Sequence, residues 1–244
     1  MRTTTGRCLE TGITTVRLIG DLTGETIATV RAVVGKAAAE CPTAVVVDLT
    51  AMAPAAPDHM SVFGAVTHQA RHVWGVPVLL CAPTAELRAA FAEIRPLVAL
   101  YDDHELARTA VYADVPHWVR RRLAPAAGSA RAARVLLGDA CRGWGLAHLY
   151  ERARLIATEL AANAITHAGT EFDVTAAYTG RFLRIAAQDG SPLIPHPRAA
   201  AANGSSPLRA GGLGLRAVAA ASSHWGTTLI PGGKIVWSLL HADR

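Results

Sequence analysis

The sequence predicts an α/β protein, with α+β character in its second half, built from two domains. Strands and helices alternate through the first half of the chain, and a proline-interrupted segment follows at 113–117. The second half has a different order, in which two helices precede two hairpins. These observations place the domains at 1–113 and 114–244.

Apolar runs define the elements expected in the first domain. Continuous β-branched or apolar runs predict strands at 13–19, 44–48, 76–82 and 97–101. Apolar residues at helical spacing predict helices at 23–39, 58–74, 84–94 and 103–110. The first domain is therefore expected to be a compact α/β unit.

The second domain is expected to begin with a charged strand at 118–125. Helices are predicted at 130–144, 149–167 and 213–222, a hairpin at 172–188, and a last hairpin turning at 231–233. The stretch 190–212 is rich in Gly, Pro and Ala and too broken for a core element. A loop of this length inside a domain is either a functional lid, here about 197–210, or a disordered segment.

Composition restricts the class of protein. The 244 residues are 51% hydrophobic, yet no window is long and apolar enough for a membrane span, and the N-terminus lacks a signal-type apolar run. We therefore expect a cytoplasmic protein without a membrane partner. Four widely spaced cysteines without a C-x-x-C pair argue against a zinc site or a disulfide framework.

The net charge of +5 includes the run Arg120-Arg121-Arg122, which could support phosphate or nucleic-acid binding. No aromatic residues are interleaved with these arginines. The favoured interpretation is a solvated strand or helix face, and no direct binding of nucleic acid is expected.

Chemistry-bearing residues gather in the second half. Glu159, Asn163 and His167 lie four apart and share one helix stripe, which taken alone reads as a solvated face. A strand then ends at Asp189-Gly190, and the glycine-rich run 211–215 opens a helix whose exposed N–H groups favour anions. Two acids, an amide and a glycine-rich helix start could together hold a magnesium nucleotide.

Five sequence blocks carry a resemblance in this half: ARAARVLLGDACRGWGL, ELAANAITHAGT, QDGSPLIPHPR, GGLGLRAVAAASSHWG and GGKIVW. In this order they resemble the GHKL (Bergerat) ATP-binding domain of gyrases, heat-shock chaperones and histidine kinases, a two-layer α/β sandwich. Among these proteins the chain looks closest to the anti-sigma-factor serine kinases of high-GC bacteria.

The resemblance implies ATP and Mg²⁺ as ligands and assigns roles by motif position. Glu159 would be the catalytic residue that orients or activates the nucleophile, and Asn163 would ligate Mg²⁺. Asp189, followed by Gly190, would accept the exocyclic amine of adenine. The backbone would cradle phosphate at Gly212, Gly214 and Leu215.

Three features depart from the family pattern or stay open. Where many relatives have Asp-x-Gly-x-Gly, this chain has Asp189-Gly190-Ser191-Pro192, so the second glycine is missing. His167 is interpreted as a helix C-terminal or packing residue rather than a phospho-acceptor. His68 and His72 have ligand-like spacing, but no third metal ligand is evident.

The block VVVDLTAMAPAAPDHMSVFGAV in the first half resembles a STAS domain, the mixed-sheet fold of anti-anti-sigma factors. Asp58 stands where that family carries its phosphorylated serine. Asp58 is either a fixed charge that imitates the phosphorylated state or only a helix cap. Ser61, one turn further on, is a less accessible alternative acceptor.

These resemblances imply a partner-switching regulator of transcription. It would bind Mg-ATP and act as an anti-sigma factor or serine-protein kinase towards a STAS antagonist. Its partners would be a sigma factor, a separate STAS antagonist that keeps the serine, or both, and a homodimer is plausible by analogy. The alternative is a non-catalytic scaffold that senses ATP or binds no nucleotide.

Overall fold

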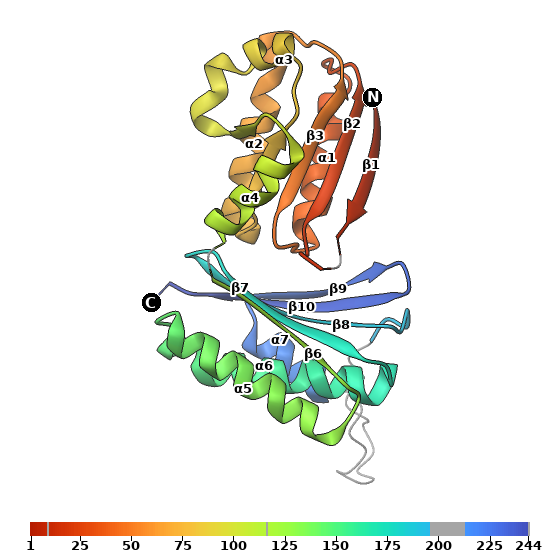
Figure 1. Ribbon diagram of the computed structural model, residues 1–244, viewed down its shortest axis with the longest axis vertical. Coiled ribbons are helices and arrows are strands. Elements are labelled where there is room, and N and C mark those ends of the chain that lie inside the picture. The colour runs from red at the N-terminus through yellow and green to blue at the C-terminus, as the bar shows by residue number, and fades with distance from the viewer. Residues whose placement is uncertain (9, 116, 196–212, 244) are drawn as a thin grey trace. The chain divides into compact units, whose positions relative to one another are not determined.

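The computed structural model describes residues 1–8, 10–115, 117–195 and 213–243, so Gly212 and the predicted lid at 197–210 lie outside the described residues. The chain forms two compact units, Met1–Pro116 and His117–Arg244. Each unit contains one five-stranded sheet with helices packed against it (Figure 1).

The N-terminal unit has a mixed sheet in the order β1-β2-β3-β4-β5. Strand β1 pairs antiparallel with β2, and the remaining pairs are parallel. The strands are β1 (Arg2–Arg7), β2 (Thr14–Gly20), β3 (Val45–Met52), β4 (Val78–Cys81) and β5 (Ala99–Tyr101). The helices are α1 (Ile27–Ala39), α2 (Pro57–Trp74), α3 (Ala85–Ala90), the 3₁₀ turn η1 (Ala92–Leu97) and α4 (His104–Asp114).

Apolar packing fixes this unit. Helices α1 and α2 pack against each other, and their buried residues join alternate residues of β2, β3 and β4 in one hydrophobic cluster. Helix α4 contacts β3, β4 and β5, and its buried Ala107 and Val111 lie outside that cluster. Because alternate strand residues point to opposite faces, α4 covers the second face of the parallel strands.

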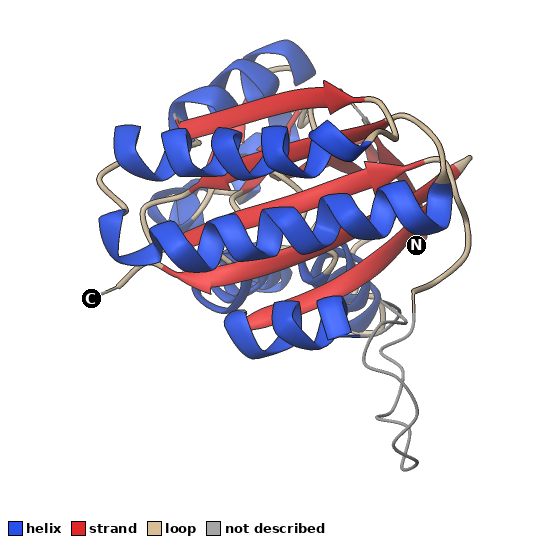
Figure 2. Ribbon diagram, turned by 90° about the horizontal axis from the view of Figure 1, so that it is seen from below, coloured by secondary structure: helices blue, strands red, loops and turns tan. Residues whose placement is uncertain are grey.

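The C-terminal unit has an antiparallel sheet in the order β6-β7-β8-β10-β9. Its strands are β6 (His117–Leu123), β7 (Phe172–Tyr178), β8 (Phe182–Asp189), β9 (His224–Ile230) and β10 (Gly233–His241). Its helical segments are α5 (Ala127–Gly143), η2 (Ala147–Leu149), α6 (Tyr150–Asn163), η3 (Ala164–Ala168) and α7 (Leu213–Ala221). Helices α5, α6 and α7 lie on one face of the sheet (Figure 2). The predicted two-layer α/β sandwich is confirmed, as is the mixed sheet of the first unit.

Two local differences from the prediction have physical reasons. Strand β1 was not predicted, because RTTTGR is a mostly exposed, polar edge strand without apolar alternation. The long helix expected to reach His167 ends as an α-helix at Asn163 and continues as the π turn η3. Among the described helices, none is long and apolar enough to cross a bilayer.

Candidate nucleotide-binding site

Helix α6 presents the first two predicted site residues. Its buried Ile156 and Leu160 belong to the core of the C-terminal unit, whereas Glu159 and Asn163 are half-buried. Neither Glu159 nor Asn163 has a side-chain hydrogen bond within the described residues, so both are available to a ligand. The helical spacing thus places an acid and an amide on one stripe, as predicted.

The segment that carries His167 is not α-helical. The α-helix ends at Asn163, and Ala164–Ala168 forms a π turn, in which the backbone bonds from i to i+5. His167 lies in the last part of η3 and is exposed, and Gly169 ends the turn in the left-handed conformation with φ of 63°. The prediction of a continuous α-helix to His167 is therefore wrong.

Helix α7 brings the glycine-rich block onto α6. A Cβ atom placed on Gly214 would lie only 2.5 Å from Oε2 of Glu159, so a side chain at 214 would force the Glu159 carboxylate to move. Leu215 is 7% exposed and packs into the core, and Arg152 of α6 donates two hydrogen bonds to the carbonyl of Ala221 at the end of α7. The start of α7, where backbone N–H groups lack helical partners, is thereby held beside Glu159.

Asp189 ends strand β8 inside the protein. It is 4% exposed, and its Oδ1 accepts hydrogen bonds from the backbone N–H of Ser191 at 2.9 Å and from Nζ of Lys234 at 2.8 Å. Its Oδ2 is buried and has no hydrogen-bond partner within the described residues. A buried acceptor without a donor is costly, and a donor on a ligand would satisfy it.

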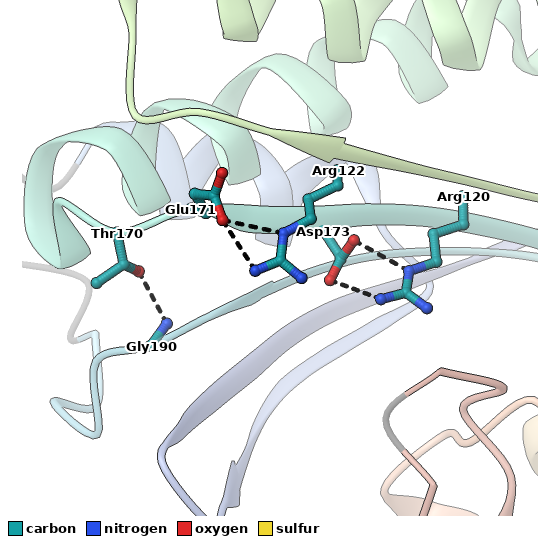
Figure 3. A network of polar contacts seen from close by, with 6 residues as sticks. All are labelled: Arg120, Arg122, Thr170, Glu171, Asp173 and Gly190. Atoms are coloured by element: carbon teal, nitrogen blue, oxygen red, sulfur yellow. Dashed lines mark hydrogen bonds and ion pairs between the residues drawn. The ribbon is translucent and has the colours of Figure 1, made fainter.

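Gly190 joins the Asp189 block to the segment after α6 (Figure 3). Its N–H donates to Oγ1 of Thr170 at 3.0 Å, and a Cβ on Gly190 would press on the Thr170 side chain at 3.2 Å. No hydrogen bond joins Asn163 to Asp189 among the residues that the structure describes. Asp189 is held through Oδ1 alone, so its Oδ2 and the Asn163 amide are the groups without a hydrogen-bond partner in the described part of the chain.

The basic run on β6 is an edge-strand surface paired with acids. Arg120 donates to both carboxylate oxygens of Asp173, at 3.0 and 2.9 Å, and Arg122 donates twice to Glu171 (Figure 3). The Arg120–Asp173 pair is bidentate, whereas both donors of Arg122 meet the same oxygen, Oε2 of Glu171, so each of these two arginines is paired locally with an acid. These contacts agree with the strand-face interpretation of the run.

Asp58 occupies the first turn of α2 without capping it. The N-cap residue is Ala56, Pro57 follows at the first helical position, and no side chain makes a capping hydrogen bond there. The prediction that the Asp58 side chain caps the helix by accepting a backbone hydrogen bond is therefore wrong. Its exposed carboxylate in the first turn still interacts favourably with the helix dipole. Ser61 is exposed and donates its hydroxyl to the carbonyl of Asp58 at 3.2 Å.

The N-terminal unit contains a second polar cluster, in which His104 lies between the carboxylate of Asp48 and the thiol of Cys81. Oδ2 of Asp48 lies 3.1 Å from Nε of Arg17 and 3.3 Å from Nε2 of His104, and Nδ1 of His104 lies 3.5 Å from Sγ of Cys81. Burial, and then the charge of Asp48, raise the pKa of the Cys81 thiol to about 12. A thiol that stays protonated at neutral pH is a poor nucleophile, so this cluster is structural.

Sequence reasoning assigns no role to the side chains of Lys234, Ser191 and Thr170. Lys234 is fully buried, and its block GGKIVW enters the sequence analysis only as part of the resemblance. A lysine within an otherwise apolar strand signals a buried acidic partner, because an unpaired ammonium group is expensive to bury. The signal was present, but it did not say which acid was the partner.

The donors and acceptors present fit a magnesium nucleotide. Oδ2 of Asp189 is an unused buried acceptor, which suits an exocyclic amine, and the start of α7 supplies N–H donors for phosphate. Within the described residues, no three His, Cys, Asp or Glu side chains gather as a metal site. A magnesium ion would therefore depend on Asn163 together with the phosphates, as is common for this ion.

The fold and these contacts define a domain class. Residues 123–238 match the family model of the histidine kinase-like ATPase domain. The C-terminal unit therefore carries a domain of this class, following an N-terminal unit with the mixed sheet expected of a STAS-like module.

Several solved structures are similar to the chain. An anti-sigma factor antagonist from Mycobacterium paratuberculosis has 20% identity and a TM-score of 0.40, over 45% of this chain and 92% of that one. The RsbU and RsbW domains of a Mycobacterium tuberculosis protein have 18% identity and a TM-score of 0.39, over 50% of this chain and 32% of that one. The Bacillus antagonist SpoIIAA in its unphosphorylated form has 15% identity and a TM-score of 0.38, over 46% and 97%. Comparison with curated protein sequences gave no match.

Proposed function

We propose that this chain is a partner-switching regulator whose C-terminal unit binds Mg-ATP and acts as an anti-sigma factor and serine-protein kinase. The observation that carries the proposal is the buried Asp189 carboxylate with its unused Oδ2, in a histidine kinase-like ATPase domain. Oδ2 would accept a hydrogen bond from the exocyclic amine of adenine. Basic residues outnumber acidic ones in this unit, which suits an anionic nucleotide.

The remaining site residues divide the work of phosphoryl transfer. Asn163 would hold Mg²⁺, which neutralises charge on the phosphates, and the backbone at Gly212, Gly214 and Leu215 would cradle them. Glu159 would accept the proton of the serine hydroxyl. As the oxygen of that serine bonds to the γ-phosphorus, the bond to the β-phosphate oxygen breaks and ADP leaves.

The acceptor serine would belong to another chain. By the resemblance to STAS domains, Asp58 in the first turn of α2 would stand at the acceptor position, and a carboxylate offers no hydroxyl to a serine kinase. The proposed partner is therefore a separate STAS antagonist that keeps its serine, alongside a sigma factor. A homodimer is proposed by analogy with relatives of both modules, and the proposed compartment is the cytoplasm.

A second candidate is a non-catalytic scaffold that senses ATP or binds no nucleotide. Two observations favour it: Asp58 replaces the acceptor, and Ser191-Pro192 follows Gly190 where many relatives keep a second glycine. This alternative shares the nucleotide site but not the transfer step, so the two functions can be separated by experiment.

The first test is calorimetric titration of the purified chain with Mg-ATP. We expect binding that requires Mg²⁺ and is lost or weakened about tenfold or more in Asn163→Ala and Asp189→Asn. Asp139→Asn is the matched control, because Asp139 is a mostly exposed acid in the same unit and, among the residues that the structure describes, its ion pair is with Arg142. If the wild-type chain bound no ATP at millimolar concentration, the proposed nucleotide site would be refuted.

The second test separates kinase from scaffold. Labelled γ-phosphate should appear on a serine-bearing STAS protein and disappear with Asn163→Ala. Binding without transfer would favour the scaffold, whereas steady phosphate release without any partner would indicate an ATPase instead.

A further inference from the structure

A buried ion pair lies at the centre of the candidate adenine site. Lys234 on β10 and Asp189 on β8 are directly opposed in the antiparallel ladder, and Nζ lies 2.8 Å from Oδ1. Each side chain is 1% exposed. The pair is therefore shielded from solvent and from salt screening.

The close approach of the two strands delivers Lys234 to this position. A Cβ on Gly233 would overlap the carbonyl oxygen of Asp189, so glycine is required before the lysine. The backbone of β10 can then run directly against the end of β8. The Lys234 side chain is placed by the sheet itself rather than by a loop.

Lys234 also fixes the chain that follows Asp189. Its Nζ donates to the carbonyl of Ser191 at 3.2 Å, while the N–H of Ser191 donates to Oδ1 of Asp189 at 2.9 Å. These three groups form a closed set of hydrogen bonds. These hydrogen bonds hold Ser191, which lies in the Asp189–Pro192 segment where the family's second glycine is missing.

The two oxygens of Asp189 consequently differ. Oδ1 accepts from two donors, whereas Oδ2 accepts from none within the described residues. A carboxylate with one oxygen saturated and the other open is a directional acceptor. An amide at this position would instead bring a donor of its own.

We propose that Lys234 is a positioning residue for base recognition, which commits Oδ1 of Asp189 to the protein and thereby aims Oδ2 at the 6-amino group of a purine nucleotide. This role rests on the proposed nucleotide-binding function. Stability alone explains the pair poorly, because buried ion pairs often contribute little compared with apolar residues of the same volume.

The test compares ATP with purine riboside triphosphate, which lacks the 6-amino group, on the full chain. Wild type should bind ATP roughly tenfold more tightly, as expected for one hydrogen bond to a charged acceptor. Lys234→Met keeps the stem but removes the donors, so this preference should fall to near unity. Lys36→Met is the matched control, because Lys36 is the other lysine of the chain and lies exposed on α1.

A purely structural role predicts a different pattern. Lys234→Met would then weaken both nucleotides equally and keep the preference for ATP, which would overturn the proposal while nucleotide binding stands. Wild type that binds both nucleotides equally would overturn it as well. Wild type that binds neither would overturn the proposed function and, with it, this role of Lys234.

A measurement on wild type covers the case in which Lys234→Met does not fold. Lys36 should react with an amine-labelling reagent in the native protein, whereas Lys234 should react only after unfolding. Labelling of both lysines at similar rates, read by peptide mass spectrometry, would overturn the buried pairing on which the proposal depends.

Discussion

Gly214 packs directly against Glu159: a Cβ on the glycine would lie 2.5 Å from the carboxylate oxygen Oε2. The two residues are 55 positions apart in the sequence, yet the contact joins the glycine-rich block to the proposed catalytic acid. It places the start of α7 and the middle of α6 in one site. Any side chain at 214 must displace either the helix or Glu159.

Gly214→Ala is therefore expected to weaken Mg-ATP binding, because the new Cβ would push the Glu159 carboxylate aside, but to change the stability of the C-terminal unit by less than about 1 kcal/mol, because only the end of a flexible side chain must move. The measurements are calorimetric titration and thermal unfolding. Gly128→Ala is the matched control, because Gly128 lies in helix α5 with open space at its Cβ position. If Gly214→Ala bound Mg-ATP as tightly as wild type, the contact between Gly214 and Glu159 would have no role in nucleotide binding.

Asp48 should make the N-terminal unit sensitive to acid. Burial alone would raise the pKa of Asp48, but hydrogen bonds from Thr50 and the charges of His104 and Arg17 hold it below its ordinary value. A depressed carboxyl pKa stabilises the fold above the unfolded pKa, near 3.9, and this contribution disappears as pH falls through the folded value.

Asp48→Asn should accordingly lower stability by about 1–3 kcal/mol at neutral pH, since buried hydrogen bonds are lost. The difference from wild type should shrink below about pH 4 and vanish at lower pH. Denaturant unfolding at several pH values checks this, with Asp21→Asn as an exposed control. If the stability difference between wild type and Asp48→Asn stayed constant at every pH, the depressed pKa of Asp48 would be contradicted.

Three cysteines should differ in reactivity. Burial raises the pKa of Cys81 to about 12 and that of Cys141 to about 11, so both thiols stay protonated at neutral pH. Cys8 is exposed; burial opposes ionisation, but hydrogen bonds from Thr11 and neighbouring backbone lower its thiol pKa overall. A thiol reagent at pH 8 should label Cys8 first, as read by mass spectrometry. Rapid labelling of native Cys81 would contradict its buried, protonated state.

Asp58→Ser should restore a phospho-acceptor if the sequence register with STAS proteins is correct. The position lies in the exposed first turn of α2 and makes no capping hydrogen bond, so the substitution should fold with little loss of stability. An active serine kinase of this type should then phosphorylate the variant but not wild type. The control is the same variant with Ser61→Ala, and loss of the signal in that control would assign the phosphate to Ser61.

The candidate site was predictable where its signal is local. Helical periodicity places Glu159 and Asn163 on one stripe, but only the resemblance of the surrounding blocks to GHKL domains marks them as site residues. Asp189 and Gly190 were found because a strand ends at them. The end of the helix was not predictable in the same way, since the π turn that replaces the α-helix before His167 leaves no plain mark in the sequence.

The sequence by itself determined the two α/β units, most strands and helices, and the acids and glycines of the site, because hydrophobic periodicity and glycine-rich turns act over short distances. Only the tertiary structure decided the partners of those residues. Lys234 meets Asp189 through the register of β10 on β8, and Gly214 meets Glu159 through the packing of α7 on α6. Register and helix packing depend on contacts summed over the whole unit, so no short stretch of sequence encodes them.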